Sequence, residues 1–229
     1  MKKIISILVL LCTALLTVHA ERVIVGAEQT KQYLPLLKNK RVALLSNHTG
    51  IIIQTTSEKA YPQPLPRRRG EIKGDTIHTL DLLLKNGVNV TAIFSPEHGF
   101  RGTAREGELV ASSVDEKTGI PILSLYDGKS KRPSKEAMQT FDVLITDIQD
   151  VGLRFYTYYV TMYRLMDVCA QEGKQFMVFD RPNPNGYYVD GPILDMKHKS
   201  GVGALPIPVV HGMTLGELAL MINGERWLS

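Results

Sequence analysis

Five short apolar runs with polar ends recur along the chain after its first forty residues. Strands of a parallel sheet have this pattern, because helices cover both faces of the sheet and leave little of the strand in contact with water. We therefore predict five buried strands, at residues 41–45, 90–94, 122–125, 143–148 and 176–179.

Amphipathic stretches alternate with these runs. Apolar residues recur at helical spacing at 77–84, 155–169 and 215–222, and Thr214 and Glu217 have the spacing of a capping box at the start of the last stretch. Strands that alternate with helices predict an α/β fold with right-handed crossovers. The expected architecture is a Rossmann-like, open, mostly parallel sheet with helices on both faces.

The beginning of the chain has a different pattern. In residues 1–20 two lysines precede an apolar stretch, residues 4–18, and the small residue Ala20 follows. A basic start, an apolar core of this length and a small residue at its end indicate a secretory signal peptide that is cleaved after Ala20. The apolar stretch is short for a membrane span, and no later stretch is longer. We expect residues 21–229 to be exported, to the periplasm or outside the cell, without a transmembrane segment.

One internal segment interrupts the alternation of strands and helices. Residues 54–74 contain three prolines and the basic triplet Arg67–Arg69, and they show no apolar period. This composition predicts a surface loop or insertion.

Composition mainly excludes classes of protein. A hydrophobic content of 44% is typical of one soluble domain with a buried core, and 19 Gly and 12 Pro are too few for a collagen-like or disordered chain. Two cysteines cannot form a disulfide framework. The formal net charge of +4 falls by two when the lysines of the signal peptide are removed, so we expect no nucleic-acid partner.

Polar and charged residues follow the ends of the predicted strands. In open α/β sheets, ligands bind beyond the carboxyl ends of the strands, so residues from several strands can meet there. The residues at these exits are Asn47, Glu97, His98, Arg101, Asp147, Gln149, Asp150, Arg154, Tyr156, Tyr158, Asp180 and Arg181.

Glu97 is the best candidate for acid–base chemistry, because it follows a strand and has His98 and Arg101 near enough to influence its protonation. The other exit residues have structural alternatives. Asp180 could cap the next helix, and Arg154 or Arg181 could pair with Asp147 or Asp150 to hold loops in place. His211 could be an ordinary turn residue, and Tyr159 is more typical of the core than Tyr156 or Tyr158.

Several other sites are excluded by spacing. No G-x-G-x-x-G follows a strand, so we expect no dinucleotide, and there is no Walker loop, H-E-x-x-H or G-x-S-x-G motif. Asp147, Asp150, His48 and His98 match no metal-ligand spacing, so a metal-dependent hydrolase is the weakest hypothesis and we expect no metal or cofactor. Carboxylates accompanied by Asn, Gln, Arg and Tyr suit a polyhydroxylated substrate such as a sugar.

Four longer motifs resemble one known family. The runs FSPEHGFRG (94–102), DIQDVGLRFYTY (147–158), DRPNP (180–184) and PVVHGMTLGELA (208–219) are similar to those of the DUF1343 family, whose characterised members are exo-acting β-N-acetylmuramidases of peptidoglycan turnover. The resemblance implies hydrolysis that releases N-acetylmuramic acid from the non-reducing end of peptidoglycan glycan fragments.

The resemblance also implies roles for the exit residues. Glu97 corresponds to the family's proposed catalytic acid/base, and Asp147, Asp150 or Asp180 could supply a second carboxylate unless the substrate's N-acetyl group acts as the nucleophile. Arg101, Arg154 or Arg181 could bind the lactyl carboxylate. The catalytic candidates are thus Glu97, Asp147 and Asp150. The substrate-binding candidates are Asn47, His98, Arg101, Gln149, Arg154, Tyr156, Tyr158, Asp180 and Arg181.

Members of this family continue into a smaller C-terminal domain. We expect residues 21–229 to form one catalytic domain without that second domain. An alternative hypothesis is therefore a remnant that binds muramic acid or peptidoglycan without turning it over.

Overall fold

The structure is a computed structural model that describes residues 23–54, 75–97, 99–100, 112–125 and 132–229. The chain divides into two compact units, and the one described below comprises residues 24–54 and 76–229. The predicted signal peptide, residues 55–74 of the predicted insertion, and the site candidates His98 and Arg101 lie outside the described residues.

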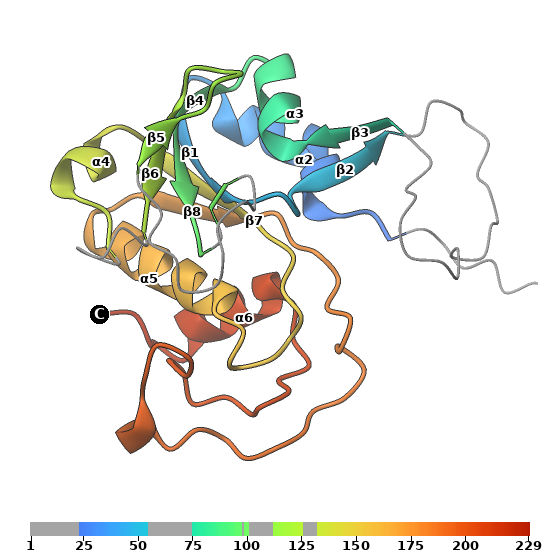
Figure 1. The fold of residues 1–229 in the computed structure, drawn as a ribbon, viewed down its shortest axis with the longest axis vertical. Helices are drawn as coiled ribbons and strands as arrows, with labels where there is room; N and C mark the ends of the chain where they lie inside the picture. The colour runs from blue at the N-terminus through green and yellow to red at the C-terminus, as the bar shows by residue number, and fades with distance from the viewer. Residues whose placement is uncertain (1–22, 55–74, 98, 101–111, 126–131) are drawn as a thin grey trace, which may run out of the picture. The chain divides into compact units, whose positions relative to one another are not determined.

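A six-stranded sheet in the order β5-β6-β4-β1-β7-β8 forms the centre of this unit (Figure 1). All neighbouring strands pair in parallel except β5, which is antiparallel to β6. The mostly parallel α/β fold predicted from the sequence is thus confirmed, and each of the five apolar runs overlaps a strand, with boundaries that differ by one residue at most. The strands are β1 (Arg41–Ser46), β4 (Asn89–Ser95), β5 (Ser113–Val114), β6 (Pro121–Ser124), β7 (Val143–Asp147) and β8 (Gln175–Val178).

Helices pack on both faces of the sheet, as expected for buried parallel strands (Figure 1). The predicted capping box at α6 is present, because the Thr214 side chain accepts from the Glu217 N–H and the Glu217 side chain accepts from the Thr214 N–H. Two expected boundaries were wrong: Ile77 belongs to a strand, and Phe155 precedes the helix that begins at Tyr158. The helices are α2 (Thr30–Leu37), α3 (Thr79–Lys85), α4 (Lys135–Gln139), α5 (Tyr158–Gln171), α6 (Leu215–Gly224) and the 3-10 turns η1 (Gly26–Glu28) and η2 (Met196–His198).

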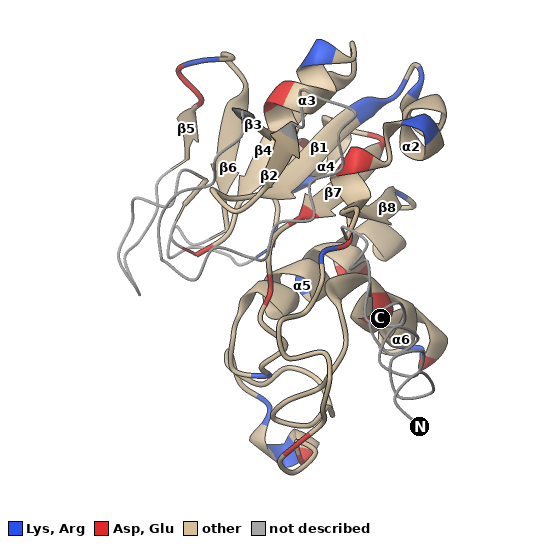
Figure 2. Ribbon diagram, turned by 90° about the vertical axis from the view of Figure 1, so that its right-hand side faces the viewer, with Lys and Arg blue, Asp and Glu red and all other residues tan. Residues whose placement is uncertain are grey.

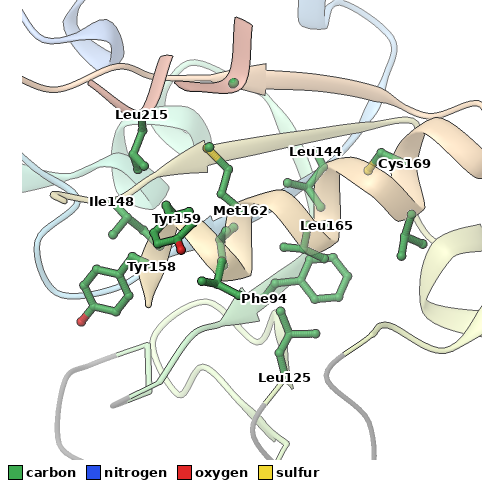
Figure 3. Packing of buried hydrophobic residues seen from close by; sticks show 14 of the residues in the cluster. Phe94, Leu125, Leu144, Ile148, Tyr158, Tyr159, Met162, Leu165, Cys169 and Leu215 are labelled. Carbon is green, nitrogen blue, oxygen red and sulfur yellow. The ribbon is translucent and has the colours of Figure 1, made fainter. Parts of the chain in front are cut away.

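Successive residues of β1 contribute to two separate apolar clusters. Ala43 and Leu45 pack with residues of α5 and α6, whereas Val42 and Leu44 pack with residues of α2 and α3. Figure 3 shows the first cluster, in which Phe94 and Leu144 of the sheet face Met162 and Leu165 of α5. This alternation follows from the two-residue period of a strand and fixes the sheet between two helical layers.

Two features were not predicted from the sequence. A small second sheet pairs β2 (Ile51–Gln54) with β3 (Asp75–His78). Between β8 and α6 the chain forms an irregular hairpin, in which bridges join Asp190 to Val210 and Ser200 to Gly203, and the Leu194 N–H donates to the Ile207 carbonyl at 3.2 Å. We call residues 190–210 the crossover hairpin.

The charges of the described residues are mixed. Figure 2 shows Lys and Arg interspersed with Asp and Glu over the strand ends, helices and loops. No helix within the described ranges combines the length and the apolar character that a membrane crossing needs.

Candidate functional site

The exits of β1 and β7 are joined by direct hydrogen bonds. Ser46 Oγ donates to the Asp147 carbonyl at 2.8 Å, and the Gln149 N–H donates to Thr49 Oγ1 at 3.0 Å. Thr49 Oγ1 in turn donates to Asn47 Oδ1 at 2.6 Å. Adjacent parallel strands bring these segments together although they are about one hundred residues apart in sequence.

Glu97 lies half-buried at the N-terminus of α5. Thr157 is the N-cap residue of that helix, and its Oγ1 donates to Glu97 Oε2 at 2.9 Å. The predicted acid–base residue is therefore held between the exit of β4 and the start of α5.

Two tyrosines lie beside Glu97. The rings of Tyr156 and Tyr158 meet edge to face with centroids 4.8 Å apart. Burial raises the pKa of Tyr158 well above its usual value, with further contributions from Tyr156 and from the charge of Glu97. Figure 3 shows the Tyr158 hydroxyl pointing away from the apolar cluster. Tyr159, in contrast, is fully buried and its hydroxyl accepts from the Ala204 N–H at 3.1 Å, so its predicted core role is confirmed.

Asp150 is a buried carboxyl with one oxygen that accepts no hydrogen bond from the described residues. Oδ1 accepts from the Gly152 N–H at 2.8 Å, whereas Oδ2 has no hydrogen-bond partner within the described residues. Burial raises the pKa of Asp150 to about 6, against the opposing effect of hydrogen bonds from the Gly152, Val151 and Tyr159 backbone. Because Tyr159 is in the first turn of α5, Asp150 lies at the same helix terminus as Glu97.

Asn47 lies beside the Tyr158 hydroxyl, and its side chain opposes the rise in the pKa of Tyr158. The residue is fully buried, and its Oδ1 accepts from the Thr49 N–H and hydroxyl. Its Nδ2 makes no hydrogen bond of normal geometry with the described residues. A buried amide donor without a partner is costly, and a ligand oxygen is one group that could satisfy it.

Asp147 and Arg181 form a buried ion pair. Arg181 Nε and Nη2 donate to the two carboxylate oxygens at 2.5 and 3.1 Å, and the side chains are 7% and 0% exposed. Thr79 Oγ1 also donates to Asp147, and Arg181 donates to the Ile51 carbonyl at 3.2 Å. This is one of the loop-holding pairings that the sequence allowed, and it occupies both oxygens of Asp147.

Asp180 caps α6, which was the structural alternative for this residue. Its Oδ2 accepts from Thr214 Oγ1 at 2.6 Å and its Oδ1 accepts from the Gly216 N–H at 2.8 Å. A Cβ added to Gly216 would lie 2.7 Å from the Asp180 carboxyl carbon, so the glycine permits this close approach.

Arg154 and Gln149 are bound to backbone carbonyls. Arg154 Nη1 donates to the carbonyls of Pro192 and Ile207, both at 2.7 Å, and thereby holds the crossover hairpin. Gln149 Nε2 donates to the carbonyls of Asp150 and Pro182 at 2.7 and 2.9 Å. Both side chains lie at the strand exits, where they hold loops.

Sequence reasoning missed two residues near this edge. In sequence, Thr157 is an ordinary residue for the start of a helix. The only signal that pointed to a functional role is its position inside the motif at 147–158. His211, read as a turn residue, is 4% exposed, and burial lowers its pKa. Its Nδ1 accepts from the Met213 N–H at 3.3 Å, and its Nε2 has no partner among the described residues.

In the described part of the chain, no metal cluster is found, and one sizeable cavity lies away from Glu97. Within the described ranges, no three His, Cys, Asp or Glu side chains are placed to hold a metal ion. A cavity of about 590 Å³ lies between α5, β8 and α6, where Phe176, Val178 and Leu220 line it. None of its lining residues is Glu97, Thr157 or Tyr158.

The chain is similar to proteins of known structure and to a curated enzyme. It is 45% identical over 195 residues to the peptidoglycan beta-N-acetylmuramidase NamZ of Bacillus subtilis (strain 168), an alignment that covers 84% of this chain and 42% of that protein. Crystal structures of two DUF1343 family proteins from Bacteroides fragilis NCTC 9343 also match. One is 58% identical with a TM-score of 0.71, and the match covers 91% of this chain and 48% of that protein. The other is 38% identical with a TM-score of 0.73, and the match covers 90% of this chain and 47% of that protein.

This chain thus spans less than half the length of these relatives. The match to the family model nevertheless extends over residues 65–229 and includes all four motifs that carried the resemblance. It covers well over half of the chain, which therefore belongs to the family described as exo-beta-N-acetylmuramidase NamZ, N-terminal.

Proposed function

We propose that this chain is the catalytic part of an exo-acting glycoside hydrolase that releases N-acetylmuramic acid from the non-reducing end of peptidoglycan fragments. The observation that carries the proposal is the position of Glu97, half-buried at the N-terminus of α5 with Thr157 donating to its carboxylate. The similarity to a peptidoglycan beta-N-acetylmuramidase supports the substrate class. Glu97 would protonate the glycosidic oxygen as the bond to the leaving sugar breaks.

Asp150 is the best supported second carboxyl. Its pKa of about 6 and its unpaired Oδ2 suit a group that exchanges a proton or contacts the sugar near neutral pH. Asp147 is occupied by Arg181, and Asp180 is occupied by α6. We assign these two to holding the strand exits in place rather than to the reaction.

The same reasoning narrows the choice of carboxylate-binding arginine. Arg154 is bound to two carbonyls of the crossover hairpin and Arg181 to Asp147. Arg101, which follows Glu97 in the PEHGFRG motif, remains as the candidate for the lactyl carboxylate of muramic acid. Asn47 Nδ2 is a donor suited to a hydroxyl or acetamide oxygen of the sugar.

The test is hydrolysis of a chromogenic β-N-acetylmuramide by the purified chain. We expect release of the chromophore by the wild type and a loss of at least about a hundredfold in Glu97→Gln. Glu172→Gln, an exposed glutamate at the other end of α5, is the matched control and should keep full activity. Binding of the sugar without turnover, by folded protein, would instead support a muramic-acid-binding module.

Selectivity is tested with the corresponding N-acetylglucosaminide, which lacks the lactyl group. We expect Arg101→Gln to reduce the preference for the muramide by about ten- to a hundredfold, because a charge-assisted hydrogen bond is lost. Arg154→Gln should leave the preference unchanged. If Arg154→Gln reduces the preference and Arg101→Gln does not, Arg154 is the residue that binds the lactyl carboxylate.

We also propose that the protein is exported, on the strength of the predicted signal peptide. To test this, the full chain is expressed in a bacterium that has an outer membrane, the cells are fractionated, and the N-terminus is identified by mass spectrometry. A mature chain that begins at Glu21 in the periplasm or medium is expected, and an intact N-terminus in the cytoplasm would contradict the proposal.

A further inference from the structure

Thr157 occupies a helix-capping position without capping the helix. A threonine at an N-cap normally accepts a hydrogen bond from an N–H of the first turn, which satisfies one of the unpaired donors there. Thr157 has φ −78° and ψ 1°, outside the extended conformation usual for this position, and its side chain makes no cap bond. Its hydroxyl donates to Glu97 Oε2 at 2.9 Å.

The O–H of Thr157 is directed to a side chain that lies 60 residues earlier in the sequence. Helix capping would use the lone pairs of the same oxygen and would not require this bond. The contact with Glu97 is therefore not explained by the stability of α5 alone.

We propose that Thr157 is a positioning residue that fixes the orientation of the Glu97 carboxyl for proton transfer, an inference that rests on the proposed function. Glutamate has three rotatable side-chain bonds, so a carboxyl at a loop adopts many orientations unless something holds it. The bond from Thr157 joins this carboxyl to a 14-residue helix.

The proposal predicts a defect in the chemical step without a defect in binding. Thr157→Val keeps the shape of the side chain and removes only the hydroxyl, so it leaves the pocket intact. A displacement of about 1 Å in a catalytic group reduces turnover by about a hundredfold. We therefore expect kcat for the chromogenic muramide to fall by about ten- to a hundredfold in Thr157→Val with KM unchanged.

The conservative variant Thr157→Ser retains the hydroxyl and should keep kcat within about threefold of wild type. Thr140→Val is the matched control, because its hydroxyl donates to the Ala137 carbonyl at the end of α4. It should change stability more than turnover. Wild-type kcat in Thr157→Val would overturn the inference, while the loss of turnover in Glu97→Gln would still support the proposed function.

A second measurement does not depend on turnover. Urea unfolding of Thr157→Val, Glu97→Ala and the double variant forms a double-mutant cycle for this contact. We expect Thr157→Val to raise the unfolding equilibrium constant by about fivefold when Glu97 is present and to have no such effect when Glu97 is already replaced by alanine. Additive effects of the two substitutions in this cycle would show that the contact contributes nothing and would overturn the positioning role. Absence of sugar release by the wild type would overturn the proposed function, whatever the result of the cycle.

Discussion

Replacing Asp150 with asparagine should stabilise the protein near neutral pH, although the residue lies in the candidate site. Asp150 is 6% exposed, and its Oδ1 accepts a hydrogen bond from the Gly152 N–H at 2.8 Å. Asparagine has nearly the same shape, keeps an acceptor for Gly152 and carries no charge. The substitution therefore removes the free-energy penalty of a buried charge while it leaves the backbone turn intact.

The magnitude follows from the pKa. Burial raises the pKa of Asp150 from 3.8 to about 6, and this difference corresponds to about 3 kcal/mol in the free energy of unfolding. The folded chain binds the proton more tightly than the unfolded chain does. The stabilising effect of that proton is complete below about pH 4 and is lost as the pH rises through about 6.

Urea denaturation followed by circular dichroism, near pH 4 and again near pH 7.5, tests the prediction. Asp150→Asn should match wild type at the lower pH and exceed it by up to about 3 kcal/mol at the higher pH. Equal or lower stability of the variant at both pH values would refute the reasoning. If Asp150 also takes part in the reaction, the stabilised variant should lose turnover, as a strained functional group commonly does.

Asp142→Asn provides a control with the opposite sign. Hydrogen bonds from Arg41 lower the pKa of Asp142 to about 2, so its contribution is present above about pH 4 and is lost as the pH falls through about 2. The variant should therefore be less stable than wild type near neutral pH, with a difference that shrinks in acid. The pair is exposed, so the effect should be small.

Three further substitutions test the structural assignments. Gly216→Ala should lower the melting temperature, because the added Cβ would displace the Asp180 carboxyl. This loss should outweigh the preference of about 1 kcal/mol that alanine has over glycine in a helix. In an Asp180→Ala background the loss should disappear. Arg181→Met should destabilise the chain to urea by about 3–5 kcal/mol by leaving Asp147 buried and unpaired, and Asp147→Leu in the same chain should recover much of it. Arg154→Gln should speed amide hydrogen exchange in the crossover hairpin and leave that of the central strands unchanged.

The fold was predictable because the local signals and the packing agree. The run at 143–148 is apolar in sequence and is a fully buried strand in the structure, and the capping box of α6 forms as its residues indicate. The small sheet of β2 and β3 escaped prediction because its strands flank a segment rich in proline and arginine, which favours a loop.

The site was only partly predictable, because the role of a side chain depends on distances that the sequence does not contain. Asp147 ends one strand and Asp180 lies just after another, yet Asp180 caps a helix and Asp147 pairs with an arginine. The sequence alone is compatible with a structural or a catalytic role for each of these two aspartates. Thr157 was missed for the same reason, since its partner Glu97 is remote in sequence and a threonine at a helix start is common.

The nested bridges of the crossover hairpin bear on how this segment forms. Ser200 and Gly203 can meet first, because the loop that joins them is very short. Once they have met, the contacts of Leu194 with Ile207 and of Asp190 with Val210 each close only a few more residues, so the entropy of closing a long loop is never lost in one step. The hairpin can therefore form stepwise, from Ser200 and Gly203 at its tip to Asp190 and Val210 at its base, whatever the order in which the strands of the sheet pair. Extra residues at the exposed tip, between Gly201 and Val202, should therefore be tolerated.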